Sequence, residues 1–218
     1  WYFLLKPSLK PVEDRKPPVK RKRGRPPKPK SAGESIPETI IAATRYVYAD
    51  TGFRDFSVEL VLAEAGISRP TFYRHFKDKY DVISVVVERA NRLLLDEVLQ
   101  RIDGSQSLRD VVDRGVEAYF DWGLNIGKLA GSIYREIHDP ESPASVHRDK
   151  NMVRLTAVLQ SAGEHSGLQL DSAVYEALVH TIEHVGHRAF WPTARSAKET
   201  QALKDTIYLI LYRTLELN

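Results

Sequence analysis

Apolar residues recur at helical spacing along most of the chain from Ile36 onward. The pattern predicts helices near residues 36–50, 57–65, 69–76, 79–101, 108–122, 124–138, 143–163, 172–190 and 197–216. The breaks between them fall at Gly66, Gly104, Asp139-Pro140, Gly163 to Gly167 and Trp191-Pro192. No segment of useful length alternates apolar and polar residues as a half-buried strand does. We therefore expect an all-α fold of about nine helices.

Serine residues mark several of the predicted helix starts. The segments 35–38 (Ser-Ile-Pro-Glu) and 196–199 (Ser-Ala-Lys-Glu) fit a capping box, in which the serine and the glutamate each bind a free backbone N–H. Ser57 and Ser68 are expected to cap two short helices. Gly66 lies between these helices and can adopt the left-handed conformation of a tight turn. This order of helix, turn and helix is the plan of a helix-turn-helix motif.

The second short helix carries side chains suited to a DNA groove. Phe72 and Phe76 are four residues apart and can anchor it inward. Arginine can bind guanine, a threonine methyl can contact thymine, and tyrosine or histidine can donate to phosphate. The predicted DNA-binding residues in and around this helix are Ser57, Ser68, Arg69, Pro70, Thr71, Tyr73, Arg74, His75 and Lys79. The alternative is a plain helical hairpin, in which so many exposed Arg, Tyr and His side chains would be unusual.

The residues from Ala65 to Lys79 resemble the DNA-binding domain of the TetR (tetracycline-repressor) family. The resemblance lies in the order A-G-[IV]-S-x-x-T-x-Y-x-x-F-x-x-K, preceded by Gly52-Phe53, and covers about residues 36–82. Leu62 departs from it, because the family usually has alanine there, and we interpret this as a core adjustment. The resemblance implies a helix-turn-helix DNA-binding domain over residues 35–82 and a helical effector-binding and dimerisation domain over 83–218.

A basic, proline-rich segment precedes these domains. Residues 1–35 contain 11 Lys and Arg but only 3 Asp and Glu, although the whole chain has a formal net charge of +3. Few apolar residues lie between 6 and 34, so we expect residues 1–34 to form a flexible arm. The run Arg23-Gly24-Arg25-Pro26 resembles an AT-hook, whose arginines enter the narrow minor groove of A·T-rich DNA. The alternatives are a generic basic tail or a targeting-like basic run.

The last two predicted helices have apolar residues on more than one side. In 172–190, Val174, Leu178, Ile182, Val185 and Ala189 share a face. In 197–216, Leu203, Ile207, Ile210 and Leu211 lie on one side, with Leu209, Tyr212 and Leu215 elsewhere. A helix with apolar residues on two sides needs cover on both, which a homodimer interface would supply. Burial inside a larger monomer is the alternative.

Two side-chain groups in the C-terminal half are candidate ligand sites. An apolar effector pocket could be lined by Tyr119, Trp122, Tyr134, Ile137 and Met152, although aromatics at helical spacing also form ordinary cores. His180, His184 and His187 have a spacing that could hold a transition metal, but a polar helix face is the simpler interpretation. We therefore predict no metal site and no cofactor beyond a small-molecule effector.

The sequence as a whole favours a ligand-responsive transcriptional repressor that binds double-stranded DNA as a homodimer. The alternative is an architectural DNA-binding protein of the same fold without an effector. An apolar cavity of roughly several hundred cubic ångströms would favour the effector, whereas a solid core would favour the alternative. We do not expect an enzyme, because the chain lacks cysteine, a glycine-rich phosphate loop, G-x-S-x-G and H-E-x-x-H. With no long apolar run, we expect a cytoplasmic, nucleoid-associated protein with no membrane partner.

Overall fold

The computed structural model describes residues 35–190, 193 and 195–217 of the 218-residue chain, and these contain helices and no strand. The helices are α1 (Ile36–Asp55), α2 (Val58–Ala65), α3 (Arg69–Tyr73), α4 (Lys79–Ile102), α5 (Leu108–Ile126), α6 (Lys128–Glu136), α7 (Pro143–His165), α8 (Ser172–Gly186), the short 3-10 helix η1 (His187–Ala189) and α9 (Ala197–Thr214). The all-α prediction is confirmed for the described part of the chain. None of the described helices is long and apolar enough to cross a membrane.

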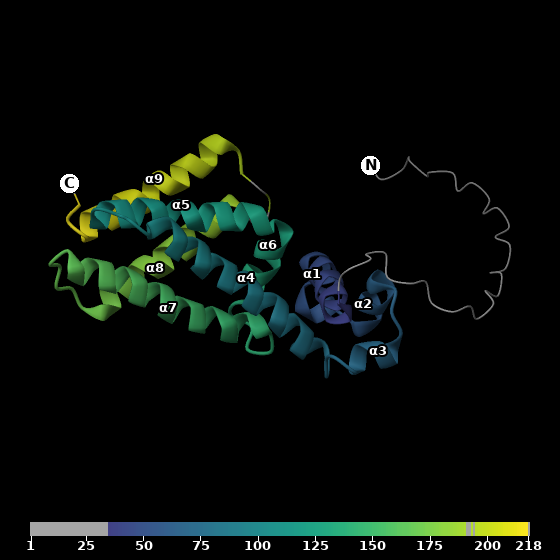
Figure 1. Ribbon diagram of the computed structural model, residues 1–218. Coiled ribbons are helices and arrows are strands. Elements are labelled where there is room, and N and C mark those ends of the chain that lie inside the picture. The colour runs from purple at the N-terminus through teal and green to yellow at the C-terminus, as the bar shows by residue number, and fades with distance from the viewer. Residues whose placement is uncertain (1–34, 191–192, 194, 218) are drawn as a thin grey trace, which may run out of the picture.

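Helices α1, α2 and α3 lie together at one end of the molecule, and α5 to α9 form a bundle at the other (Figure 1). Helix α4 leads from the first group into the second and packs on α1, α5 and α7. The domain boundary expected after residue 82 therefore falls within α4. The core is continuous along this helix, where Val82, Val86 and Leu94 are all buried.

Local sequence signals fixed several helix ends as expected. Gly66 adopts φ 65° and ψ 33° and ends α2, and the Ser57 side chain accepts from the Leu60 N–H at 3.4 Å. Ser196 and Glu199 form the predicted capping box at the start of α9. At Gly52 the backbone leaves the helical conformation with φ 71°, so the predicted end near residue 50 is a kink, and α1 continues to Asp55.

Four details of the prediction were wrong. Ser35 makes no side-chain cap, because the Glu38 carboxylate accepts two hydrogen bonds from Arg89 of α4, at 2.6 and 2.8 Å. Ser68 does not cap α3 either, since its hydroxyl lies 2.8 Å from that of Thr71. Helix α3 ends three residues before Phe76. The helix predicted at 124–138 is interrupted at Gly127, whose φ of 59° separates α5 from α6.

A buried carboxylate joins the N-terminal helices to the bundle. Glu136, the last residue of α6, is 7% exposed. Its Oε1 accepts from the Phe53 backbone N–H at 2.6 Å, and its Oε2 accepts from the hydroxyls of Tyr48 at 2.7 Å and Ser142 at 2.8 Å. Burial and the adjacent carboxylate raise the pKa of Tyr48, so its hydroxyl remains a donor. One carboxylate thus holds two residues of α1 to the segment between α6 and α7.

The kink in α1 fits around this carboxylate. A Cβ added at Gly52 would lie 2.7 Å from Glu136 Oε1, closer than such contacts allow. Two further contacts connect α6 to α1: the Ser132 hydroxyl donates to the Ala49 carbonyl at 2.9 Å, and the Lys128 ammonium donates to the Asp50 carboxylate at 2.9 Å. We call this contact region around Glu136 the joint. The orientation of the N-terminal helices is therefore set mainly by α6.

Replacing the central carboxylate should destabilise the protein strongly. We expect Glu136→Ala to lower the free energy of unfolding by about 3 kcal/mol, because buried donors lose their acceptor. Denaturant unfolding measures this loss. Glu141→Ala is the matched control, since Glu141 is exposed in the next loop and should change stability by less than about 0.5 kcal/mol. Equal effects of the two substitutions would contradict the role assigned to Glu136.

Candidate functional site

The short helix α3 is anchored by the two predicted phenylalanines. Phe72 is fully buried and Phe76 is 8% exposed, with ring centroids 5.8 Å apart. Pro70 lies in the first turn, where a missing N–H costs no helical hydrogen bond. The two buried rings fix the rotation of α3 about its axis, and therefore which of its residues face outward.

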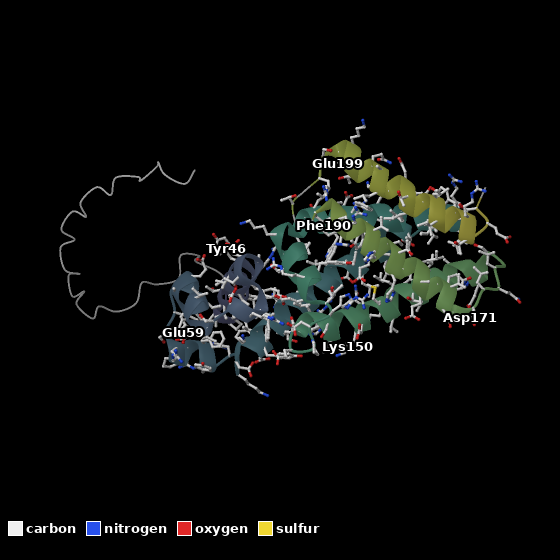
Figure 2. All side chains as sticks on the ribbon, turned by 180° about the vertical axis from the view of Figure 1, so that it is seen from behind. Tyr46, Glu59, Lys150, Asp171, Phe190 and Glu199 are labelled. Atoms are coloured by element: carbon white, nitrogen blue, oxygen red, sulfur yellow. The ribbon has the colours of Figure 1, made fainter. Side chains whose placement is uncertain are left out.

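The outward face of α3 presents basic and aromatic side chains. Arg69, Arg74 and His75 are exposed, and Tyr73 is 47% exposed with its ring edge-on to Phe72. Arg69 forms an ion pair with Glu59 of α2. Figure 2 shows Glu59 near the end of the molecule that lies farthest from Asp171. Arg69, Tyr73, Arg74 and His75 are therefore exposed side chains of one short segment at this end of the protein.

The predicted residues around α3 differ in how accessible they are. Ser68 and Pro70 are exposed, whereas Ser57 and Thr71 are half-buried. Ser57 serves as the α2 cap described above, and the Thr71 hydroxyl faces that of Ser68. Contact between any of these residues and DNA stays a prediction.

Lys79 is engaged within the protein. Its ammonium donates to the Phe53 carbonyl at 2.9 Å and lies 4.2 Å from the centroid of the Phe53 ring. Lys77, two residues earlier, is exposed in the turn between α3 and α4. Lys77 was not among the predicted residues, although its position between the two helices that flank this turn is a signal visible in the sequence. Arg23, Gly24, Arg25 and Pro26 lie outside the described residues.

The bundle contains an apolar cavity of about 70 Å³. Helices α4, α5, α7, α8 and α9 form its walls, mainly through aliphatic side chains such as Val98, Val116 and Leu159. Gly115 of α5 also lines it, and a Cβ at that position would meet nothing within 4 Å. We call this space the apolar cavity.

A second cavity of about 30 Å³ lies beside it, with α6 as an additional wall. All of the predicted effector residues line this second cavity: Tyr119, Trp122, Tyr134, Ile137 and Met152. Its lining also includes four polar residues that were not predicted, namely Asn91, Arg148, Asn151 and Glu183. We call this space the polar cavity. Phe190, labelled in Figure 2, closes part of the wall. The structure thus brings the predicted set together, but the space is smaller than a cavity of several hundred cubic ångströms.

Charged and aromatic groups around the polar cavity are largely satisfied internally. Arg148 donates to both oxygens of Glu183 at 2.6 to 3.1 Å, and the two side chains are only 15% and 11% exposed. Burial raises the pKa of Tyr119 well above its ordinary value, and burial with the Glu183 charge raises that of Tyr134 to about 12. Both phenols therefore remain neutral at physiological pH.

The predicted histidine face is not a uniform polar surface. His187 is 7% exposed and stacks on Tyr134, with ring centroids 3.5 Å apart, whereas His184 is exposed. Desolvation lowers the pKa of His187, which favours its neutral form. Among the described residues, no group of three or more potential ligands is arranged to hold a metal ion.

Helix α9 has one covered and one open side. Ile207 and Leu211 are fully buried and Leu215 is 1% exposed, while Leu209 is 59% and Ile210 is 37% exposed. The predicted grouping of Ile210 with Ile207 and Leu211 is only partly reproduced, because Ile210 is exposed with Leu209, whereas Leu215, expected elsewhere, is buried with Ile207 and Leu211. No other described residue of this chain covers the side of α9 that carries Leu209 and Ile210.

Known proteins share both the N-terminal segment and the fold. Residues 40–86 match the family model described as "Bacterial regulatory proteins, tetR family". The chain is 29% identical over 85 residues to the HTH-type transcriptional activator FasR of Mycolicibacterium smegmatis, covering 39% of this chain and 38% of that protein. It is 31% identical over 100 residues to an uncharacterized HTH-type transcriptional regulator of Haemophilus influenzae, covering 44% of this chain and 47% of that protein.

A solved TetR-like transcriptional regulator from Rhodococcus sp. RHA1 has the same fold. It superposes with a TM-score of 0.67 over 84% of this chain and 97% of its own, at 21% identity. The matches to the two curated relatives span less than half of their lengths. The expected resemblance of the N-terminal segment to the tetR family model and the all-helical architecture of the described residues are confirmed.

Proposed function

We propose that this chain, with its TetR-type segment at residues 40–86, is a ligand-responsive transcriptional repressor that binds double-stranded DNA as a homodimer. The outward face of α3 carries the proposal, because Phe72 and Phe76 hold Arg69, Tyr73 and Arg74 toward one end of the molecule. One curated relative is named a transcriptional activator and the other a transcriptional regulator, which supports a role in transcription and argues against an enzyme. Repression is proposed from the family resemblance and not from these names.

The proposed interface divides into base and phosphate contacts. Arg69 and Arg74 would bind guanine edges in the major groove, with the Thr71 methyl near thymine. Tyr73, His75 and Lys77 would donate to phosphates, with Ser57, Ser68, Pro70 and Lys79 at the rim. Glu59 would orient Arg69 through their ion pair until DNA replaces it.

The N-terminal arm is proposed to add a minor-groove contact. Arginines of the Arg23–Pro26 run would enter an A·T-rich groove beside the site bound by α3. The arm ends shortly before Ile36, where α1 begins at the same end of the molecule as α3. The intervening residues could span about 30 Å when extended.

Helix α6 offers a path from the cavities to the DNA-binding helices. Tyr134 lines the polar cavity, and Glu136, two residues later, binds Tyr48 and the Phe53 N–H of α1. A ligand that shifts α6 would therefore shift α1 and the helices packed on it, changing the spacing of the two DNA-binding ends in a dimer. The small size of the cavities favours the architectural alternative, whereas the convergence of the predicted residues on a cavity beside α6 favours an effector.

The open side of α9 is proposed to form the dimer interface. Leu209 and Ile210 would pack against the same helix of a second chain, as the two-sided apolar pattern predicts. Two DNA-binding ends related by a two-fold axis would match two half-sites on the duplex.

Selection of bound DNA from a random pool, followed by fluorescence anisotropy on the selected site, tests the α3 assignment. We expect Arg74→Ala to weaken binding about 10- to 100-fold and to relax the preference at one base position. Tyr73→Phe should weaken binding similarly across sequences, because phosphate contacts carry no sequence information. Arg154→Ala removes an exposed arginine of α7 and should leave affinity unchanged. If Arg154→Ala reduced DNA affinity as much as Arg74→Ala, the result would contradict the interface proposed on α3.

The arm is tested on sites with different flanks. We expect Arg25→Ala to weaken binding about five-fold on sites with A·T flanks and less on sites with G·C flanks, because a narrow groove attracts arginine. Arg15→Ala removes the same charge outside the AT-hook-like run and should affect both flanks equally. The minor-groove role fails if Arg25→Ala also reduces binding equally on both flanks.

Light scattering in solution tests the interface. The full chain should have about twice its 24.8 kDa mass at micromolar concentration, and Leu209→Glu should give monomers because it would bury a charge. Leu93 of α4 is matched to Leu209, since its exposed fraction is 58% against 59%, and Leu93→Glu should leave the dimer intact. Dimers that persist with Leu209→Glu would place the interface elsewhere.

A further inference from the structure

The two cavities of the bundle are adjacent and share walls. Leu94, Tyr119, Met152 and Glu183 line both of them. A single ligand can therefore occupy both spaces after small side-chain movements, with one end in each. The chemistry of the two linings then specifies the two ends of that ligand.

The apolar cavity suits a hydrocarbon. Apart from aliphatic side chains it is lined by Tyr119 and Glu183, and the Tyr119 hydroxyl already donates to the Glu183 backbone carbonyl at 3.3 Å. The Glu183 carboxylate in turn accepts from Arg148. A polar ligand group placed here would lose its hydrogen bonds to water without replacement, which is unfavourable.

The polar cavity offers unpaired amide atoms. Asn151 is 3% exposed, and its Oδ1 has no hydrogen-bond partner among the described residues. The same holds for Asn91 Nδ2, on the facing helix α4. Buried polar atoms without partners are costly, so a ligand group that both donates and accepts would stabilise this lining. A hydroxyl or a primary amide does both, whichever way each asparagine amide is turned.

The charges around the polar cavity already balance. Arg148 and Glu183 neutralise one another through three contacts of 3.1 Å or less. A carboxylate ligand would place a second negative charge beside Glu183, and an ammonium would place a second positive charge beside Arg148. Either ion would be desolvated without a free partner, which carries a large penalty. The lining therefore favours an uncharged group.

The cavity sizes limit the ligand to a small molecule. The polar cavity, at about 30 Å³, accommodates about one water-sized group. The apolar cavity, at about 70 Å³, is smaller than the roughly 150 Å³ that holds benzene, so it suits a short chain.

We propose that the effector is a short, uncharged amphiphile, with its alkyl chain in the apolar cavity and a hydroxyl or amide head between Asn91 and Asn151. This inference rests on the effector role proposed above and names the chemical class of the ligand. Its test uses no DNA, so its failure and a failure of DNA binding are separate results.

Calorimetry and thermal unfolding of the full chain with butan-1-ol, butanamide, butanoate and butylammonium near neutral pH test the proposal. We expect the two neutral compounds to bind and to raise the melting temperature, with dissociation constants at least about 10-fold lower than those of the two ions. Propyl and pentyl analogues then locate the preferred chain length. The proposal is overturned if butanoate or butylammonium binds as tightly as the neutral compounds, or if no compound of the series binds.

Two substitutions locate the binding site. Asn151→Leu, which preserves size but removes the amide, should weaken butanamide binding about 10-fold or more. Thr156→Val is the matched control. Thr156 also lies on α7, and its buried hydroxyl has no hydrogen-bond partner among the described residues, but it lines neither cavity. This substitution should leave binding unchanged. Gly115→Val fills the apolar cavity and should shift the preference toward shorter chains. Unchanged binding in both Asn151→Leu and Gly115→Val would show that the compounds bind elsewhere.

Discussion

The arrangement of this protein depends on one buried carboxylate. Glu136 accepts a backbone N–H and two hydroxyls from segments before and after it in the sequence. These hydrogen bonds are directional, so they add to the packing of α1 on α4 and α6 in fixing the angle of α1. Both the direction in which α3 faces and the link to the bundle follow from this joint.

The same helix, α6, meets the joint at its end and the polar cavity along its side. Tyr134 stacks on His187 of η1, which directly follows α8. Helix α6 thus contacts the bundle through stacked rings and α1 through the hydrogen bonds of Glu136. Two-state coupling needs such connected, packed elements. The outward face of α3 lies at the other end of the molecule from the bundle, and the continuous helix α4 connects the two ends (Figure 1).

The sequence predicted interactions between nearby residues better than interactions between residues far apart in the chain. Gly66, Ser57 and Ser196 act within a few residues, and their roles were predicted from spacing alone. The outward face of α3 followed from Phe72 and Phe76. Glu136 was not predicted, because its partner Phe53 lies 83 residues away. The Lys79 contacts with Phe53 were not predicted either, because Phe53 lies 26 residues earlier in the chain.

The kink at Gly52 has a consequence for variation in this fold. The space beside its Cα is occupied by Glu136 Oε1, and its positive φ disfavours every side chain as well. Positions 52 and 136 are therefore constrained as a pair. If Glu136 were replaced, room would open at position 52, but the positive φ would still disfavour any residue other than glycine there. If Gly52 were replaced, the new Cβ would displace the Glu136 carboxylate. Neither substitution opens a neutral route to the other.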